Sequence, residues 1–117
     1  MPSAGASDYQ QIALEFAKLL AKREYPKAYE MMSRGYRERT TAEQLRASFE
    51  TIVPDDWGST GPIEVGQTMT RWPGKQAADL GWVYVSIGGD VYSEAITVVV
   101  TSESGIARIR DVEFGRP

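Results

Sequence analysis

The sequence contains no cysteine and no histidine, and each absence excludes several kinds of chemistry. Without cysteine the chain has no disulfide, no thiolate nucleophile and no Cys-ligated zinc. Without histidine it has no Ser-His-Asp triad and no Cys/His metal site. We therefore predict no metal and no cofactor. The lack of cysteine fits a reducing cytoplasm and a small periplasmic domain equally, so both compartments stay open.

The sequence also lacks long apolar runs and an excess of basic residues. No stretch approaches the ~20 apolar residues of a membrane-spanning helix, and the formal net charge is −3. We therefore expect no membrane segment and no nucleic-acid partner. Residues 51–117 hold nine Asp or Glu against five Lys or Arg. This imbalance is either ordinary variation between the two halves or an acidic strand surface that meets a basic partner.

What is present is the composition of an ordinary globular domain. The chain has 117 residues, of which 42% are hydrophobic and 25% are charged, and this predicts one folded domain. Residues 1–7 are small and polar. We expect them to form a flexible N-terminus without the basic and apolar regions of an intact signal peptide. Residues 8–117 form the predicted domain.

Apolar residues at helical spacing predict three helices in the first half of the chain. Ser7 caps the first helix, which ends near Arg23, because Pro26 disfavours a helical conformation at the residue before it. The second helix begins at Pro26 and ends at Gly35, which suits a C-terminal cap.

The third helix follows a capping box at Thr40 or Thr41 and ends before Pro54. The apolar period then changes to two, which predicts a meander of four antiparallel strands. These strands cover residues 63–72, 80–87, 92–101 and 106–114. The run Val98–Val100 is apolar on both faces, so both faces should be covered. The order indicates an α+β fold with three N-terminal helices packed on a curved four-stranded antiparallel sheet.

Two segments resemble the nuclear transport factor 2-like superfamily, a group of cone-shaped α+β folds that includes ketosteroid isomerase. ALEFAKLL (residues 13–20) followed by EYPKAYEMMS (residues 24–33) is similar to its long helix, tight break and short helix. The closing meander of residues 82–114 is similar to its sheet. The resemblance covers residues 8–115 and implies a concave pocket inside the cone. The superfamily includes enzymes, ligand-binding modules, protein-binding domains and immunity proteins, so the fold alone decides no function.

Enzymes of this superfamily place an acid–base carboxylate inside the cone, and Glu94 and Asp79 are the residues of this chain that fit that role. Glu94 alternates with apolar residues along its strand, and on a concave face burial would raise its pKa. Alternatively, Glu94 pairs with Arg108 or Arg110 on the next strand. Asp79 stands at a strand start, where a turn residue is also expected. The lack of histidine removes the Asp-His arrangement of the superfamily's dehydratases.

Aromatic and methionine side chains would line the pocket of such a cone. Large rings also fill helix–sheet cores and anchor interfaces, and these alternatives stay open. Trp82 and Tyr84 alternate along one strand, so they share a face. The predicted ligand-binding residues are Tyr29, Met32, Tyr36, Trp57, Trp82, Tyr84 and Tyr92.

The predicted function is a non-catalytic binding domain whose aromatic pocket takes a small apolar ligand or a partner segment. The outer face of the sheet would form a homodimer, because a strand that is apolar on both faces needs a cover besides the helices. One alternative is an isomerase or lyase of the ketosteroid-isomerase kind with a buried carboxylate and a tyrosine donor. The other is a protein-binding module such as an immunity protein, which would carry an exposed acidic or aromatic patch and no deep cavity.

Overall fold

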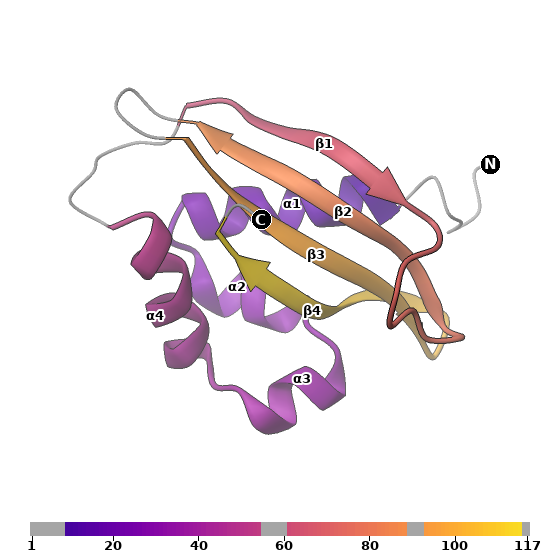
Figure 1. Ribbon diagram of the computed structural model, residues 1–117. Helices are drawn as coiled ribbons and strands as arrows, with labels where there is room; N and C mark the ends of the chain where they lie inside the picture. The colour runs from indigo at the N-terminus through magenta and orange to yellow at the C-terminus, as the bar shows by residue number, and fades with distance from the viewer. Residues whose placement is uncertain (1–8, 55–60, 89–92, 116–117) are drawn as a thin grey trace.

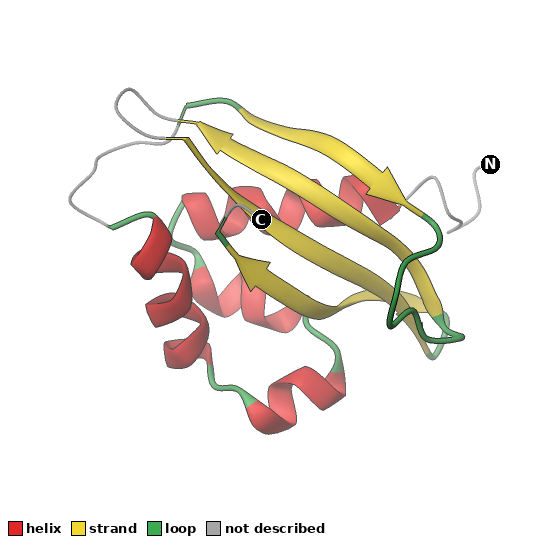
Figure 2. Ribbon diagram, viewed as in Figure 1, coloured by secondary structure: helices red, strands yellow, loops and turns green. Residues whose placement is uncertain are grey.

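Four helices precede four strands in the computed structural model, which describes residues 9–54, 61–88 and 93–115 (Figure 1). The helices are α1 (Tyr9–Ala21), α2 (Tyr25–Glu30), α3 (Arg34–Arg39) and α4 (Ala42–Ile52). The strands are β1 (Ile63–Met69), β2 (Asp79–Gly88), β3 (Ser93–Glu103) and β4 (Ile106–Phe114). The fold is therefore α+β, as predicted, with helices and strands in separate halves of the chain (Figure 2).

The first helix ends close to its predicted position, in a backbone conformation that glycine usually provides. The amides of Arg23 and Glu24 donate to carbonyls of the last turn at 3.0 and 2.9 Å, which are the hydrogen bonds of a Schellman cap. Arg23 has a φ of +62°, in the left-handed region. Its guanidinium donates to the carbonyls of Val53 and Pro54 at 3.0 and 3.1 Å. These bonds tie the α1–α2 turn to the end of α4. The predicted cap, Ser7, lies outside the described residues.

The prediction of three helices is wrong, because the described residues contain a fourth helix, α3. It lies where the second helix was expected to end, at Gly35. The Ser33 hydroxyl accepts from the Tyr36 amide at 3.2 Å and so caps a new helix. A short polar residue can end one helix or begin the next, and local spacing does not distinguish the two. The predicted capping box of the following helix is confirmed at Thr41 and Gln44 of α4.

The strands form one antiparallel sheet in the order β1-β2-β3-β4, so the predicted meander is confirmed. β1 ends at Met69, three residues before its predicted end. The Val98–Val100 run is buried on both faces, as predicted. Its middle residue, Val99, has Trp82 and Asp111 as cross-strand partners. Because Val99 is already covered within one chain, its burial requires no second copy.

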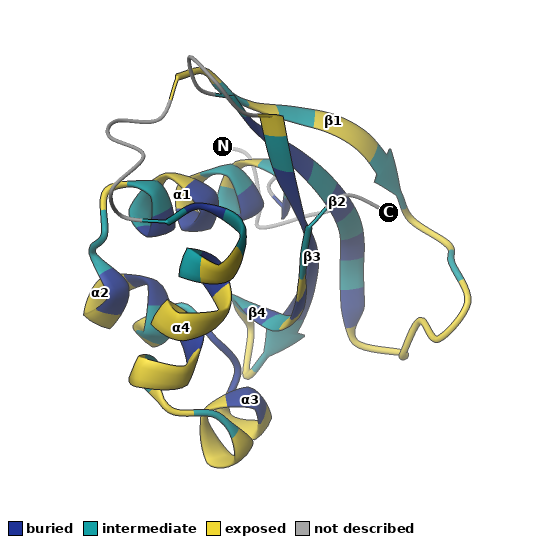
Figure 3. Cartoon of the chain, turned by 60° about the vertical axis from the view of Figure 1, so that its left-hand side comes forward, coloured by how far each residue is buried: buried dark blue, intermediate teal, exposed yellow. Residues whose placement is uncertain are grey.

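All four described helices lie on one side of the sheet (Figure 3). We call this side the inner face and the opposite side the outer face. α1 packs across all four strands, and at Gly81 of β2 a Cβ atom would collide with the ring of Tyr9. Phe16, Leu20 and Phe49 fill the space between the helices and the sheet and are fully buried. None of the described helices is long and apolar enough to span a membrane.

Candidate functional site

The inner face is filled by the chain's own side chains, and three predicted ligand-binding residues belong to this region. Met32 is fully buried in the core. Tyr36 is also buried, and burial, together with the nearby charge of Asp111, raises the pKa of its hydroxyl. The Tyr29 hydroxyl lies 2.6 Å from the carbonyl oxygen of Thr40. These side chains are engaged within the chain, and ligand binding by them stays a prediction.

Asp79, at the start of β2, forms a bidentate ion pair with Arg110 of β4. Two guanidinium nitrogens lie 2.7 Å from the two carboxylate oxygens, and the Gln76 amide donates a third hydrogen bond at 2.8 Å. Burial alone would raise the pKa of Asp79, but the hydrogen bonds from Arg110, the Gln76 backbone and Thr101 outweigh it and lower the pKa. The charged carboxylate therefore anchors the β1–β2 loop to β4. A role as proton carrier stays a prediction.

Glu94 is half-buried near the start of β3, on the inner face. The alternative ion pairs with Arg108 or Arg110 do not form, because the register sets Arg108 opposite Thr101 and Arg110 beside the Val99–Val100 step, at least five positions along β3 from Glu94. Arg110 holds Asp79, and Arg108 donates to the carbonyl of Glu30 at 2.7 Å. The structure therefore leaves Glu94 without either predicted strand partner, and its catalytic role stays a prediction.

A tyrosine–carboxylate pair does occur, at the junction of α2 and α4. The Tyr25 hydroxyl donates to Glu50 at 2.9 Å and accepts from the Arg23 guanidinium at 3.1 Å. Burial is the largest cause that raises the pKa of Tyr25. Arg46 donates to the same Glu50 oxygen at 3.4 Å. Sequence analysis missed this cluster because its members come from separate elements. Two arginines balance its carboxylate, as in a structural network.

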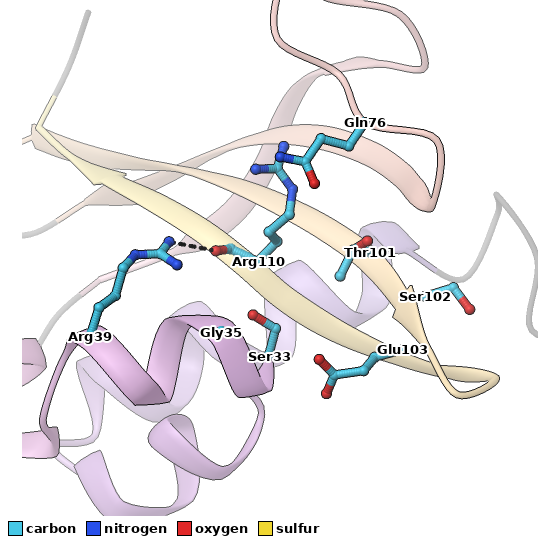
Figure 4. Close-up of a pocket in the computed structure, with 8 residues that line it drawn as sticks. All are labelled: Ser33, Gly35, Arg39, Gln76, Thr101, Ser102, Glu103 and Arg110. Atoms are coloured by element: carbon cyan, nitrogen blue, oxygen red, sulfur yellow. Dashed lines mark hydrogen bonds between the residues drawn. The ribbon is translucent and has the colours of Figure 1, made fainter.

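A polar groove of about 410 Å³ lies between α3 and the sheet (Figure 4). It is lined by Ser33, Gly35, Arg39, Gln76, Thr101, Ser102, Glu103 and Arg110. Its charged groups have partners within the chain: Arg39 donates to the carbonyl of Arg110 at 3.4 Å, and Glu103 accepts from the Arg34 amide at 3.0 Å. These two hydrogen bonds therefore hold α3 against the sheet. The described residues contain no cluster of three or more potential metal ligands.

A row of three side chains crosses the outer face from β2 to β4. The register pairs Trp82 with Val99, and Val99 with Asp111, so the three side chains stand on one face. We call them the tryptophan row. A hollow of about 230 Å³ opens over this row. Trp72 of the β1–β2 loop contributes to its lining. The hollow is lined by Trp72, Pro73, Gly74, Trp82, Val99, Arg110, Asp111 and Glu113.

A second row of the same kind lies two residues further along each strand. Tyr84 pairs with Thr97, and Thr97 pairs with Glu113; we call these three the tyrosine row. The Tyr84 ring also covers Gly66 of β1, where a Cβ atom would lie 3.1 Å from the ring. Both rows therefore run from an aromatic ring, over a β-branched residue, to a carboxylate. The ring of each row is half-buried and the carboxylate is exposed.

The structure divides the predicted ligand-binding residues between two places. Trp82 and Tyr84 stand side by side on the outer face, whereas Met32 lies on the other side of the sheet, in the core. Trp57 and Tyr92 lie outside the described residues.

Sequence analysis missed the two carboxylates of the rows, Asp111 and Glu113. Their alternation along the last predicted strand is the signal that could have placed them on one face. The registers of β2 with β3 and of β3 with β4 together set them in line with the aromatic residues, across β3.

Comparison with known proteins adds no relative. No protein-family model matches this chain, and neither a curated protein nor a solved structure matches it significantly. The function must therefore be argued from the site itself.

Proposed function

We propose that this chain is a non-catalytic binding domain that holds a segment of a partner protein on the outer face of its sheet. The observation that carries the proposal is the pair of rows, in which half-buried rings and exposed carboxylates share a face that no described helix covers. Rings in such positions anchor interfaces, because they contribute a large apolar contact area and lose little side-chain freedom.

The state of two carboxylates supports binding over proton transfer. A general base or acid needs a pKa near the working pH, whereas Arg110 and other donors lower the pKa of Asp79. The other carboxylate, Glu50, accepts from Tyr25 and from Arg46 and so is already paired with a cation. An isomerase of the ketosteroid-isomerase kind that uses either of these two carboxylates therefore has less support than a binding domain.

The packing of the inner face supports the outer face as the binding surface. Phe16, Leu20 and Met32 are fully buried between the helices and the sheet. A small apolar ligand at this place would have to displace packed side chains. Such an opening is costly, since each lost apolar contact in a core destabilises the fold. The ligand pocket predicted from the sequence is therefore the weaker candidate.

A homodimer through the outer face is the second arrangement that the rows allow. In a two-fold dimer the same patch lies on both sides of the interface, so the interface would contain Asp111 and Glu113 of both copies. Like charges disfavour such a contact. We therefore propose a monomer that binds a different partner. Sedimentation equilibrium at high protein concentration measures the oligomeric state. A dimer that is lost when Trp82 is changed would favour the homodimer over the monomer.

We also propose that the fold is a small member of the nuclear transport factor 2-like kind. Three features support the assignment: α1 packs across the whole sheet, short helices follow it, and an antiparallel meander closes the chain. Superposition of an experimental structure on members of that superfamily tests the proposal.

The proposed binding role can be tested with peptides selected from a random display library against the purified chain. We expect the selected peptides to bind the double variant Trp82→Thr, Tyr84→Thr at least about ten-fold more weakly, because rings at interface centres dominate binding energy. Threonine keeps the strand propensity of the two positions. The matched control is Ile106→Thr, which removes an apolar side chain that is 53% exposed outside both rows. Equal loss in the control, or no loss in the double variant, would contradict the proposal.

A further inference from the structure

We infer that the partner of the outer face is an extended basic segment whose cationic side chains, two residues apart, occupy the tryptophan row and the tyrosine row. This inference rests on the proposed function and adds the chemistry of the partner. It follows from three properties of the rows: their width, their spacing and their charge.

The width of each row suits one long cationic side chain. Neighbouring strands lie ~4.8 Å apart, so the ring on β2 and the carboxylate on β4 are separated by about 10 Å. On β3 between them stands Val99 in one row and Thr97 in the other, and both residues are buried. A side chain lying over β3 can therefore contact a ring on one side and a carboxylate on the other. An arginine guanidinium does both, since it stacks on aromatic faces and pairs with carboxylates.

The spacing of the rows matches the repeat of an extended chain. The two rows are two residues apart on every strand, a distance of about 6.6–6.8 Å. An extended partner segment presents the side chains of one face at the same interval. A segment that runs along β3 can thus place residues i and i+2 in successive rows.

The charge of the hollow over the tryptophan row is negative. Among the described residues, Asp111 and Glu113 line it, and Arg110, the one cation in that described lining, is neutralised by Asp79 at 2.7 Å. Arg71 and Lys75 belong to the neighbouring loop and are exposed, but neither is among the lining residues. The hollow is also smaller than the 300–1,000 Å³ typical of small-molecule pockets, so it fits a side chain of a longer partner.

Two isomeric peptides test the inference with identical composition and charge. They are blocked heptapeptides of glycine, serine and threonine that carry two arginines, placed either at positions i and i+2 or at adjacent positions. We expect the alternating isomer to bind about three- to ten-fold more tightly, because only it can place both cations in the rows. Binding is followed by amide chemical shifts, with the largest changes expected in β2, β3 and the Trp82 indole.

The double variant Asp111→Asn, Glu113→Gln tests whether these two carboxylates pair with the arginines of the peptide. We expect the alternating peptide to bind it about five- to thirty-fold more weakly. The control, Glu15→Gln with Glu43→Gln, makes the same change in net charge on exposed positions of α1 and α4. Its affinity should be unchanged.

The outcomes separate the two proposals. Equal binding of both isomers, equal losses in variant and control, or no binding of either peptide would overturn the inference. Library peptides that depend on Trp82 and Tyr84 but lack basic residues would also overturn it, while leaving the proposed function intact. If no peptide depends on the two rings, the proposed function fails and the inference fails with it.

Discussion

Removing Arg110 should destabilise the protein more than removing Asp79, although the two residues form one ion pair. The difference follows from what each change leaves behind. The Asp79 side chain is 0% exposed, whereas the Arg110 side chain is 22% exposed. In Arg110→Met, a buried carboxylate loses its charge partner, which costs about 3–5 kcal/mol. In Asp79→Asn, the guanidinium left behind still reaches water, and the asparagine can still accept from the Gln76 amide. We expect a cost of about 1–3 kcal/mol.

The pH dependence of these variants tests the same reasoning independently. The folded-state pKa of Asp79 is below its ordinary value of about 3.9. The carboxylate therefore stabilises the wild-type fold above about pH 4, and this contribution is lost as the pH falls through the folded-state pKa. Without Arg110, only the hydrogen bonds from Gln76 and Thr101 oppose burial, and because burial is the largest single cause we expect it to raise the pKa of Asp79 above that value. Folding of Arg110→Met then takes up a proton, so its deficit should shrink between pH 7 and pH 4.5.

The assay is urea denaturation of the wild type, both single variants and the double variant at pH 7 and pH 4.5. Each kcal/mol corresponds to a shift of about 0.3–1 M in the midpoint urea concentration of a small domain. The double variant leaves no buried charge unpaired, so it should recover part of the loss seen in Arg110→Met. The reasoning is refuted if Asp79→Asn costs as much as Arg110→Met, or if the deficit of Arg110→Met is the same at both pH values.

Two further predictions concern backbone positions and are checked by thermal denaturation. Gly81→Ala should destabilise the fold by about 1–3 kcal/mol, because the new Cβ would collide with the Tyr9 ring. The same change at Gly35 within α3, where a Cβ would make only an ordinary 3.8 Å contact with Arg39, should stabilise the fold by about 0.5–1 kcal/mol. Stability changes of the same sign at Gly81 and Gly35 would contradict the packing argument. Arg23→Gly should be more stable than Arg23→Ala by about 1 kcal/mol, because both lose the guanidinium and only alanine retains the left-handed strain. A less stable glycine variant would show that φ is not limiting there.

Most of the fold could be predicted because local signals agree with the global arrangement. The change of apolar period after Pro54 separates the helices from the strands, and the capping box at Thr41 marks the start of α4. The additional helix α3 was missed because Ser33 suits both the end of one helix and the beginning of another. Tertiary contacts decide between these two, and they do not show in a local pattern.

The candidate site was harder to predict, for a geometric reason. Alternation shows that Trp82 and Tyr84 share a face, but it does not show which face meets the helices. In the structure the opposite face of β2, which carries Gly81 and Val83, packs against α1. The large rings therefore point away from the core. The carboxylates come opposite them only through the register of three strands, and that register is a long-range property.

The Asp79–Arg110 pair and the outer face are connected through the β1–β2 loop. Asp79 accepts from the Gln76 amide at 2.8 Å and so holds the loop whose residue Trp72 lines the hollow. Asp79→Ala should free this loop and weaken binding of library peptides about three- to ten-fold. Trp72→Leu should cause a similar loss. If Asp79 acts by positioning Trp72, the double variant Asp79→Ala, Trp72→Leu should bind the library peptides no more weakly than Trp72→Leu alone. Affinities are measured well below the Tm of each variant. Additive losses would instead mean that the ion pair affects binding by a route that does not involve Trp72.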